Sequence, residues 1–208
     1  MPPQKTFGFA LLTLLLASSA LEAHDLWIEP AAFTPAPGQR VAVRLRVGQG
    51  FRGDPVPRDP RLIERFAALG AKGEAAIQGV PNTEPAGFAS FASPGLQVLV
   101  YDSRRERVEL DGAKFEEYLR EEGLEKVIAL RGERGQSAAP GREVFSRCAK
   151  ALVAVGGKWA GERGYDRVAG LPLELVPEKN PYALTGGGEL PVRLLYQGKP
   201  REDVLVTA

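Results

Sequence analysis

The sequence is poor in the residues that build metal and redox sites. It holds one cysteine, Cys148, one histidine, His24, and one methionine, at the start of the chain. A single cysteine excludes an intramolecular disulfide. A single histidine excludes two- and three-histidine zinc sites within one chain and the H-E-x-x-H motif of metalloproteases. His24 is therefore the one candidate for an imidazole ligand or a histidine general base.

The sequence also lacks an excess of charge of either sign. Its 208 residues include 27 Lys and Arg against 26 Asp and Glu, a net charge of +1. Nucleic-acid-binding domains usually carry a basic face and a high pI, so we expect no nucleic-acid partner. Glycine and proline, in contrast, are abundant, with 24 and 17 residues. This composition favours many turns over long helices.

Motifs of the common catalytic classes are missing as well. The chain has no G-x-S-x-G elbow, no Walker loop and no G-x-G-x-x-G after a strand. The glycines at 186–188 precede a strand and indicate a turn, and Cys148 lies in no nucleophile motif, which favours a buried structural thiol. Carboxylate pairs cannot be judged without geometry. We therefore expect no enzymatic activity.

The N-terminal segment has the features of a secretory signal peptide. Lys5 precedes an apolar run at 7–17, which is too short for a transmembrane helix. Cleavage after Ala20 suits the small-residue rule, whereas cleavage after Ala23 makes His24 the first mature residue; an uncleaved anchor is the alternative. There is no cysteine near these positions, so we do not expect a lipoprotein anchor. No later apolar segment is long enough to span a bilayer. We assign 1–23 to the signal peptide and expect a periplasmic protein.

Alternation of apolar and polar residues predicts strands along most of the mature chain. The clearest pattern covers 40–47, and further strands are expected at 24–29, 96–101, 107–110 and 172–177. The last segment, 189–208, is expected to form two strands joined by a turn at 198–200. Residues 48–60 form an expected loop. The segment 61–69 fits a strand or a short helix, and 142–156 fits either, with a strand favoured in its second half. Many short strands separated by turns predict a β-sandwich.

One segment, about 111–131, is expected to be helical. Asp111 is a candidate N-cap, and Gly123 should divide the segment into helices at 113–122 and 124–130. The resulting organisation is a β-sandwich domain at 24–177 with this helical insert, followed by a C-terminal hairpin at 178–208. That hairpin either closes the first domain or is the start of a second sandwich segment.

His24 carries the strongest chemical argument. If it is the first mature residue, its α-amino group and imidazole Nδ1 can chelate one metal ion, and such nitrogen ligands suit Cu(II), Ni(II), Zn or Co. A copper brace would need a second histidine from another subunit. Asp25, Glu29 or Asp54 could complete a weak site. The alternative is that His24 is an edge-strand residue without a ligand.

Two further features have structural interpretations. Trp27 is expected to be a core anchor rather than a ligand platform. Even spacings along one strand place three arginines, Arg40, Arg44 and Arg46, on the same face of a sheet. We expect this face to be solvated rather than to form an anion site.

Several blocks of the sequence resemble a known family. They are HDLWIEP after the signal peptide, FEEYLREEGLEKV, SRCAKALVAVG, GLPLELVPEKNPYAL and VRLLYQGKP. This set is similar to an exported bacterial family catalogued as domain of unknown function 4198, whose members are often described as periplasmic components of nickel or cobalt uptake. The resemblance covers 24–208 and implies export and an immunoglobulin-like β-sandwich. The family's leading His-Asp corresponds to His24-Asp25, and longer members continue through a further sandwich segment.

Together these observations predict an exported, non-enzymatic binding or accessory protein. Its expected ligand is a divalent nickel, cobalt or copper ion held by His24 and Asp25, with an envelope transporter or another envelope protein as partner. The alternative is an interaction or scaffold module of the envelope that binds no metal. An enzyme that uses paired carboxylates is the least supported class.

Overall fold

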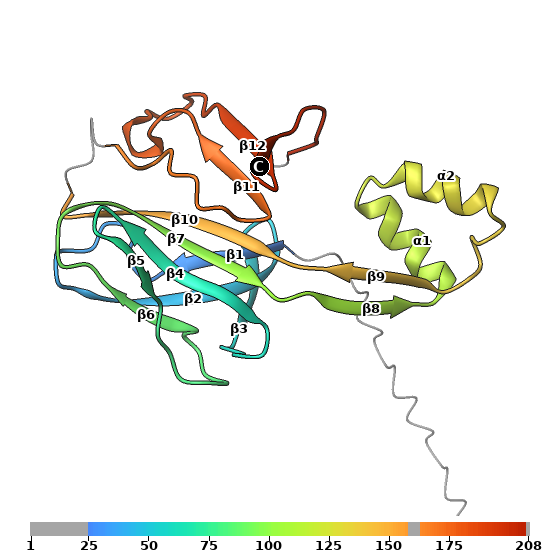
Figure 1. The fold of residues 1–208 in the computed structure, drawn as a ribbon, viewed down its shortest axis with the longest axis horizontal. Coiled ribbons are helices and arrows are strands. Elements are labelled where there is room, and N and C mark those ends of the chain that lie inside the picture. Colours follow the sequence, from blue (N-terminus) through green and yellow to red (C-terminus); the bar gives the residue numbers. More distant parts are fainter. Residues whose placement is uncertain (1–24, 158–162, 207–208) are drawn as a thin grey trace, which may run out of the picture.

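The computed structural model describes residues 25–157 and 163–206, and antiparallel strands dominate it (Figure 1). His24, the proposed signal peptide and both candidate cleavage sites lie outside the described residues. The first sheet is centred on β2, which pairs with β1 on one side and with β3 and β6 on the other. Its strands are β1 (Asp25–Pro30), β2 (Arg40–Gln49), β3 (Arg52–Val56) and β6 (Gly87–Ser90).

The second sheet has the order β10-β7-β4-β5, all antiparallel. Its strands are β4 (Ile63–Gly70), β5 (Gly73–Ala76), β7 (Gly95–Ser103) and β10 (Cys148–Val155). The ambiguous segment 61–69 thus forms a strand, β4, because it pairs with β7 on one side and with β5 on the other. The segment 142–156 also resolves into strands, with a break before Cys148.

The two sheets pack face to face around one apolar core. The alternation on β2 buries Val41, Val43 and Leu45, and β7 and β10 contribute Leu99 and Val153 from the other sheet. After β1 the chain crosses to the second sheet, where the carbonyl groups of residues 33 and 35 accept hydrogen bonds from the outer edge of β10. These features confirm the mainly β sandwich.

A two-stranded arm with a helical tip extends from β7 and β10 (Figure 1). Its elements are β8 (Glu106–Leu110), α1 (Gly112–Glu121), α2 (Glu125–Glu133) and β9 (Gly141–Phe145). Leu110, Phe115 and Leu119 form a small core of their own in the tip. Gly123 divides the helices with a φ of 65°, as the sequence predicts. Asp111 precedes α1, but its side chain makes no capping hydrogen bond.

The C-terminal part forms a third, three-stranded sheet. It contains β11 (Leu173–Pro177), β12 (Val192–Tyr196) and β13 (Lys199–Pro200), with a 3-10 turn, η1 (Pro181–Ala183), between β11 and β12. The expected hairpin turn at 198–200 is present. However, β11 pairs with β12, so the boundary expected at 177 separates two strands of one sheet.

Two expectations about the first sheet are wrong. Residues 52–56, expected in a loop, form β3, because Pro55 is tolerated on an edge strand. Trp27 is not in the core: Leu26 and Ile28 point into the sandwich, so the alternation turns Trp27 outward. There its ring lies edge-on to Phe51, with 5.8 Å between the ring centroids.

Candidate functional site

The first described residue, Asp25, lies where the chain enters the sandwich. It is exposed, begins β1 and stands opposite Gly48 of β2. The start of β1 lies near the base of the arm (Figure 1), and the Asp25 carboxylate is close enough to Glu122 for their charges to interact. Asp25 is therefore within electrostatic reach of the helical insert, which is far from it in sequence.

Negative charge accumulates at this junction between β1 and the arm. Burial raises the pKa of Glu122 above its ordinary value, and the charges of Asp25 and Glu143 raise it further. Burial likewise raises the pKa of Tyr118, whose hydroxyl also hydrogen-bonds to Glu143. We name Asp25, Glu122 and Glu143 the junction carboxylates. When these groups are ionised, the negative charges of Asp25 and Glu143 lie within electrostatic reach of Glu122 at this junction.

The other carboxylates considered from the sequence do not join Asp25. Glu29 pairs with Arg46, with 3.3 Å between Oε2 and Nε, and with Arg44. Asp54 stands opposite Val47 and thus on the other side of the sheet from Asp25, whose partner is Gly48. Among the described residues, no three His, Cys, Asp or Glu side chains come together closely enough to hold a metal ion. Any site at Asp25 therefore needs a ligand from outside this range.

The arginines of β2 are engaged in local contacts. Arg44 Nε lies 2.9 Å from an oxygen of Glu84, and Arg46 pairs with Glu29. The Arg40 guanidinium lies 3.8 Å from the centre of the Phe88 ring. Arg44 and Arg46 are thus paired with carboxylates, and Arg40 is exposed and stacked on Phe88.

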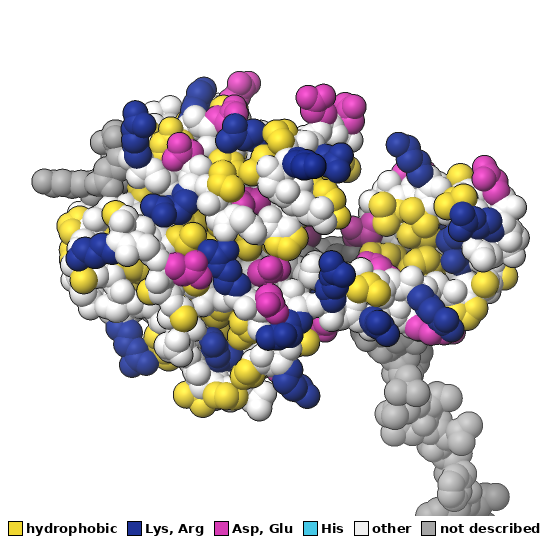
Figure 2. Space-filling model, viewed as in Figure 1, with side chains coloured by type: hydrophobic (Ala, Val, Ile, Leu, Met, Phe, Trp, Pro, Cys, Tyr) yellow, Lys and Arg dark blue, Asp and Glu magenta, His cyan; other side chains and the backbone are white. Residues whose placement is uncertain are grey.

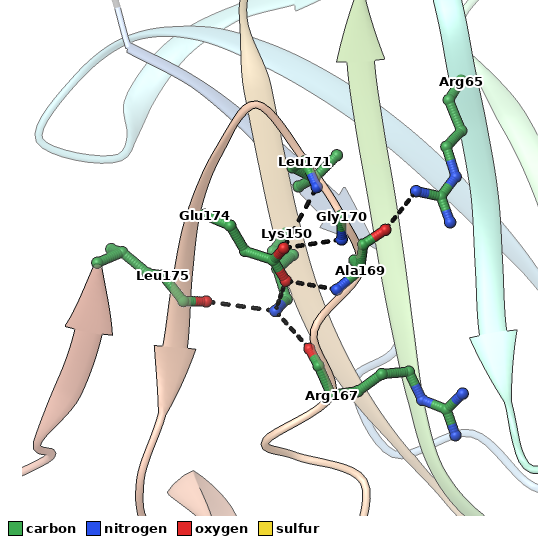
Figure 3. Close-up of polar contacts among 8 residues, drawn as sticks. All are labelled: Arg65, Lys150, Arg167, Ala169, Gly170, Leu171, Glu174 and Leu175. Carbon is green, nitrogen blue, oxygen red and sulfur yellow. Dashed lines mark hydrogen bonds and ion pairs between the residues drawn. The ribbon is translucent and has the colours of Figure 1, made fainter. Parts of the chain in front are cut away.

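The most highly connected polar cluster lies between β10 and the third sheet (Figure 3). The Glu174 side chain is 1% exposed, and its carboxylate accepts hydrogen bonds from the main-chain N–H groups of Ala169, Gly170 and Leu171 at 2.7, 2.9 and 3.2 Å. It also accepts one from Lys150 Nζ at 2.6 Å. Burial alone would raise the pKa of Glu174, but Lys150 and the N–H groups outweigh it and lower that pKa.

Lys150 and Arg65 extend this cluster. The Lys150 ammonium group also donates to the carbonyl oxygens of Arg167, at 2.9 Å, and Leu175, at 3.3 Å. Arg65 donates to the carbonyl oxygen of Ala169 at 2.6 Å (Figure 3). Each of the buried charges is thus paired and hydrogen-bonded, which is typical of a structural clamp rather than of a reactive centre.

A shallow groove of about 390 Å³ lies beside this clamp. Cys148 lines it, and burial raises the pKa of this thiol to about 11, so the reactive thiolate is disfavoured at neutral pH. The thiol donates a hydrogen bond to Asp102 at 3.5 Å. The rest of the lining is mostly apolar and includes Leu173, Leu175 and the residues 204–206.

The sequence interpretation missed both polar arrangements. The pattern at Glu174 was misleading, since the alternation in β11 places it on the face opposite Leu173 and Leu175 and so predicts that it is exposed. The junction carboxylates carried no signal, because their proximity depends on how the arm is oriented.

The visible surface has no extended region of one charge sign. Figure 2 shows Lys and Arg side chains interspersed with Asp and Glu over the sandwich and the arm, with apolar side chains between them. Within the described ranges, no helix has both the length and the apolar character needed to cross a bilayer.

Comparison with known proteins places the chain in a family. No curated protein and no solved structure matches it significantly. A family model described as "Domain of unknown function (DUF4198)" matches residues 21–208, which include every strand and helix of the structure. The chain is a member of this family of domains of unknown function.

Proposed function

We propose that this protein is an exported, non-enzymatic binding or accessory protein that takes up a divalent transition metal ion at its mature N-terminus. The observation that carries the proposal is that Asp25, the residue after His24, lies within electrostatic reach of Glu122, which is also close to Glu143. In this proposal His24 and Asp25 are the ligands, and Glu122 and Glu143 supply negative charge. The ion is cargo, either nickel, cobalt or copper.

The electrostatics of the junction support cation binding. Burial raises the pKa of Glu122, and repulsion by the charges of Asp25 and Glu143 raises it further. A bound divalent cation would relieve this repulsion and gain from the same charges. The α-amino group and imidazole of an N-terminal His24 would add two nitrogen ligands, which transition metals prefer over oxygen ligands alone.

The cellular setting is part of the same proposal. The N-terminal segment has the features of a signal peptide, and cleavage after Ala23 would deliver the protein to the periplasm with His24 first. An envelope transporter would then be the natural partner for a metal-loaded protein.

Calorimetry with Ni(II) and Cu(II) on protein that begins at His24 tests the proposal. We expect His24→Ala to abolish binding and Glu122→Gln to weaken it several-fold. Glu109→Gln, which changes a carboxylate elsewhere on the arm, is the matched control and should bind normally. Equal binding by the His24→Ala variant and the wild type would contradict the proposal. So would an intact mass of the secreted protein that corresponds to 21–208, because His24 would then lie within the chain.

A second candidate, an interaction module of the envelope, is favoured by one observation. On one side of the third sheet, the residues that face each other across β11 and β12 are Leu173 with Tyr196 and Leu175 with Leu194. Three of these apolar side chains are exposed. This function predicts a partner that is retained without metal and lost when Leu175 is changed to Glu. Retention that depends on added metal would speak against it.

A further inference from the structure

The strands β10 and β11 lie next to each other but share no hydrogen-bonded ladder. The carbonyl oxygen of Pro172 accepts a hydrogen bond from Gln197, beside β12, so the main-chain groups of Leu173 and Leu175 point the other way, towards β10. On β10, the N–H of Ala154 points outward to the carbonyl oxygen of Phe33. By the same alternation, the main-chain groups of Cys148 and Lys150 point towards β11. No backbone hydrogen bond in the described ranges joins these two edges.

Side chains of β10 take the place of the missing ladder. Lys150 reaches across to the carboxylate of Glu174 and the carbonyl oxygen of Leu175 (Figure 3). The Cys148 sulfur interacts with the main chain of Leu173. The two sheets are therefore joined here by a few side-chain contacts, and one ion pair holds most of them in place.

The other contacts across this boundary are one apolar cluster and hydrogen bonds made by Lys150, Tyr182 and Arg65. Ala169 and Leu171 pack on an apolar patch of the second sheet, formed by residues of β4 and β7. Tyr182 donates its hydroxyl to the carbonyl oxygen of Leu152 at 2.7 Å, and Arg65 binds the carbonyl oxygen of Ala169. The outer side of the third sheet adds nothing, since its apolar residues are exposed. Segments with few buried apolar contacts are those that open below the free energy of global unfolding.

We propose that residues 163–206 form a flap that opens from the second sheet as one unit, with the Lys150–Glu174 pair as its latch. Opening breaks the latch, uncovers the outer edge of β10 at Cys148 and Lys150, and leaves the sandwich core intact. The flap is one continuous segment of the chain, so the strands of the two main sheets keep all their pairing partners. This inference is independent of metal binding.

Cys148 reports on opening, because it is the only cysteine in the sequence and lines the boundary, where it is partly exposed while the flap is closed. Reaction in the closed state sets a baseline rate, above which opening adds. We would follow its reaction with an aromatic disulfide reagent in the mature protein over a range of urea concentrations below the unfolding midpoint. The flap predicts a labelling rate that hardly depends on urea at low concentrations, because a local opening exposes little surface. A rate that rises throughout this range with the steep urea dependence of global unfolding would overturn the proposal.

Two variants separate the latch from general destabilisation. Glu174→Gln leaves the Lys150 ammonium without its counter-charge and should raise the low-urea labelling rate about tenfold or more. Glu109→Gln, which removes an exposed partner of Arg142, should leave it unchanged. Hydrogen exchange gives a second measure: amides of β11 and β12 should exchange together in the Glu174→Gln variant while β7 stays protected. Equal acceleration in β7 would also overturn the proposal. If the variant does not fold, hydrogen exchange of the wild type decides: the amides of β11 and β12 should exchange with a weaker urea dependence than those of β7.

Discussion

At the scale of single residues, Glu174 shows how a buried charge can organise local structure. Its carboxylate is almost inaccessible, yet it is satisfied by one ammonium group and three main-chain N–H groups. The N–H groups belong to a loop that has no regular secondary structure of its own. The loop therefore takes its conformation largely from this side chain, together with Lys150 and Arg65, because buried main-chain groups must find partners.

Removing the Glu174 charge should destabilise the protein clearly. In Glu174→Gln, the neutral amide cannot compensate the Lys150 ammonium group, which is only 16% exposed. Breaking one side of a buried pair costs about 3–5 kcal/mol, and retained hydrogen bonds should reduce this to about 3 kcal/mol. Urea denaturation measures the change. The exposed pair of Arg142 with Glu109 is the control, where Glu109→Gln should change the free energy of unfolding by less than about 1 kcal/mol.

The lowered pKa of Glu174 also predicts an acid dependence. Since the pKa is below its ordinary value of 4.5 in the folded protein, the ionised carboxylate contributes stability at every pH above that value. This contribution is lost as the pH falls through 4.5 and through the folded pKa. We expect the free energies of unfolding of the wild type and Glu174→Gln to converge as the pH falls from about 5 through the folded pKa. A constant difference over this range would show that Glu174 does not act through its charge.

At the scale of elements, the tip of the arm has its own packing. Phe115 and Leu119 of α1 are buried there, and Glu116 pairs with Arg131 of α2, with 2.8 Å between Oε1 and Nε. The Arg131 guanidinium also lies 4.9 Å from the centre of the Phe115 ring. The two helices are thus held to each other by an ion pair and a cation–π contact, although α2 buries none of its residues.

Gly141, at the start of β9, lies directly against the Phe115 ring and leaves no room for a side chain. A Cβ atom on Gly141 would overlap the Phe115 ring. Gly141→Ala should therefore displace the ring and destabilise the tip by about 1–3 kcal/mol, measured by hydrogen exchange of α1. Gly132→Ala is the matched control: it lies in α2, nothing is near its Cβ position, and alanine should stabilise the helix by up to about 1 kcal/mol. Similar exchange in both variants would show that the Phe115 contact does not hold the tip.

The elements also show what could be predicted from the sequence. Alternation of side chains identified β2, β7 and β11, and Gly123 located the division between the helices, because both signals are local. Two errors arose where position in a sheet matters. Pro55 indicates a loop when read alone, but a proline is tolerated where its strand lies at the edge of a sheet. Trp27 was expected in the core, but Leu26 and Ile28 occupy the inward face of β1. The pairing of Glu174 with Lys150 and the closeness of Asp25 to Glu122 could not be predicted, since the two residues in each case lie far apart in the sequence.

At the scale of the whole molecule, the third sheet is notable for the apolar side chains that it exposes on one side. One side packs towards the second sheet, where Val176 and Leu195 are buried. The other side exposes apolar residues of β11 and β12 and of the segment at 204–206, among them Leu205, which is 86% exposed. Soluble proteins rarely expose contiguous apolar surface of this kind unless it is used for binding.

This surface should be detectable in the folded protein. We expect the mature wild type to bind the fluorescent dye ANS at neutral pH, because the dye reports accessible apolar surface, and we expect Leu175→Thr together with Tyr196→Thr to reduce the signal at least about twofold. Val144→Thr on β9 is the control, since that valine is also exposed but lies on the arm, away from the third sheet. Circular dichroism would verify that each variant is folded. If the control lowers the fluorescence as much as the double variant does, the dye binds the arm, and the third sheet is not the principal apolar surface.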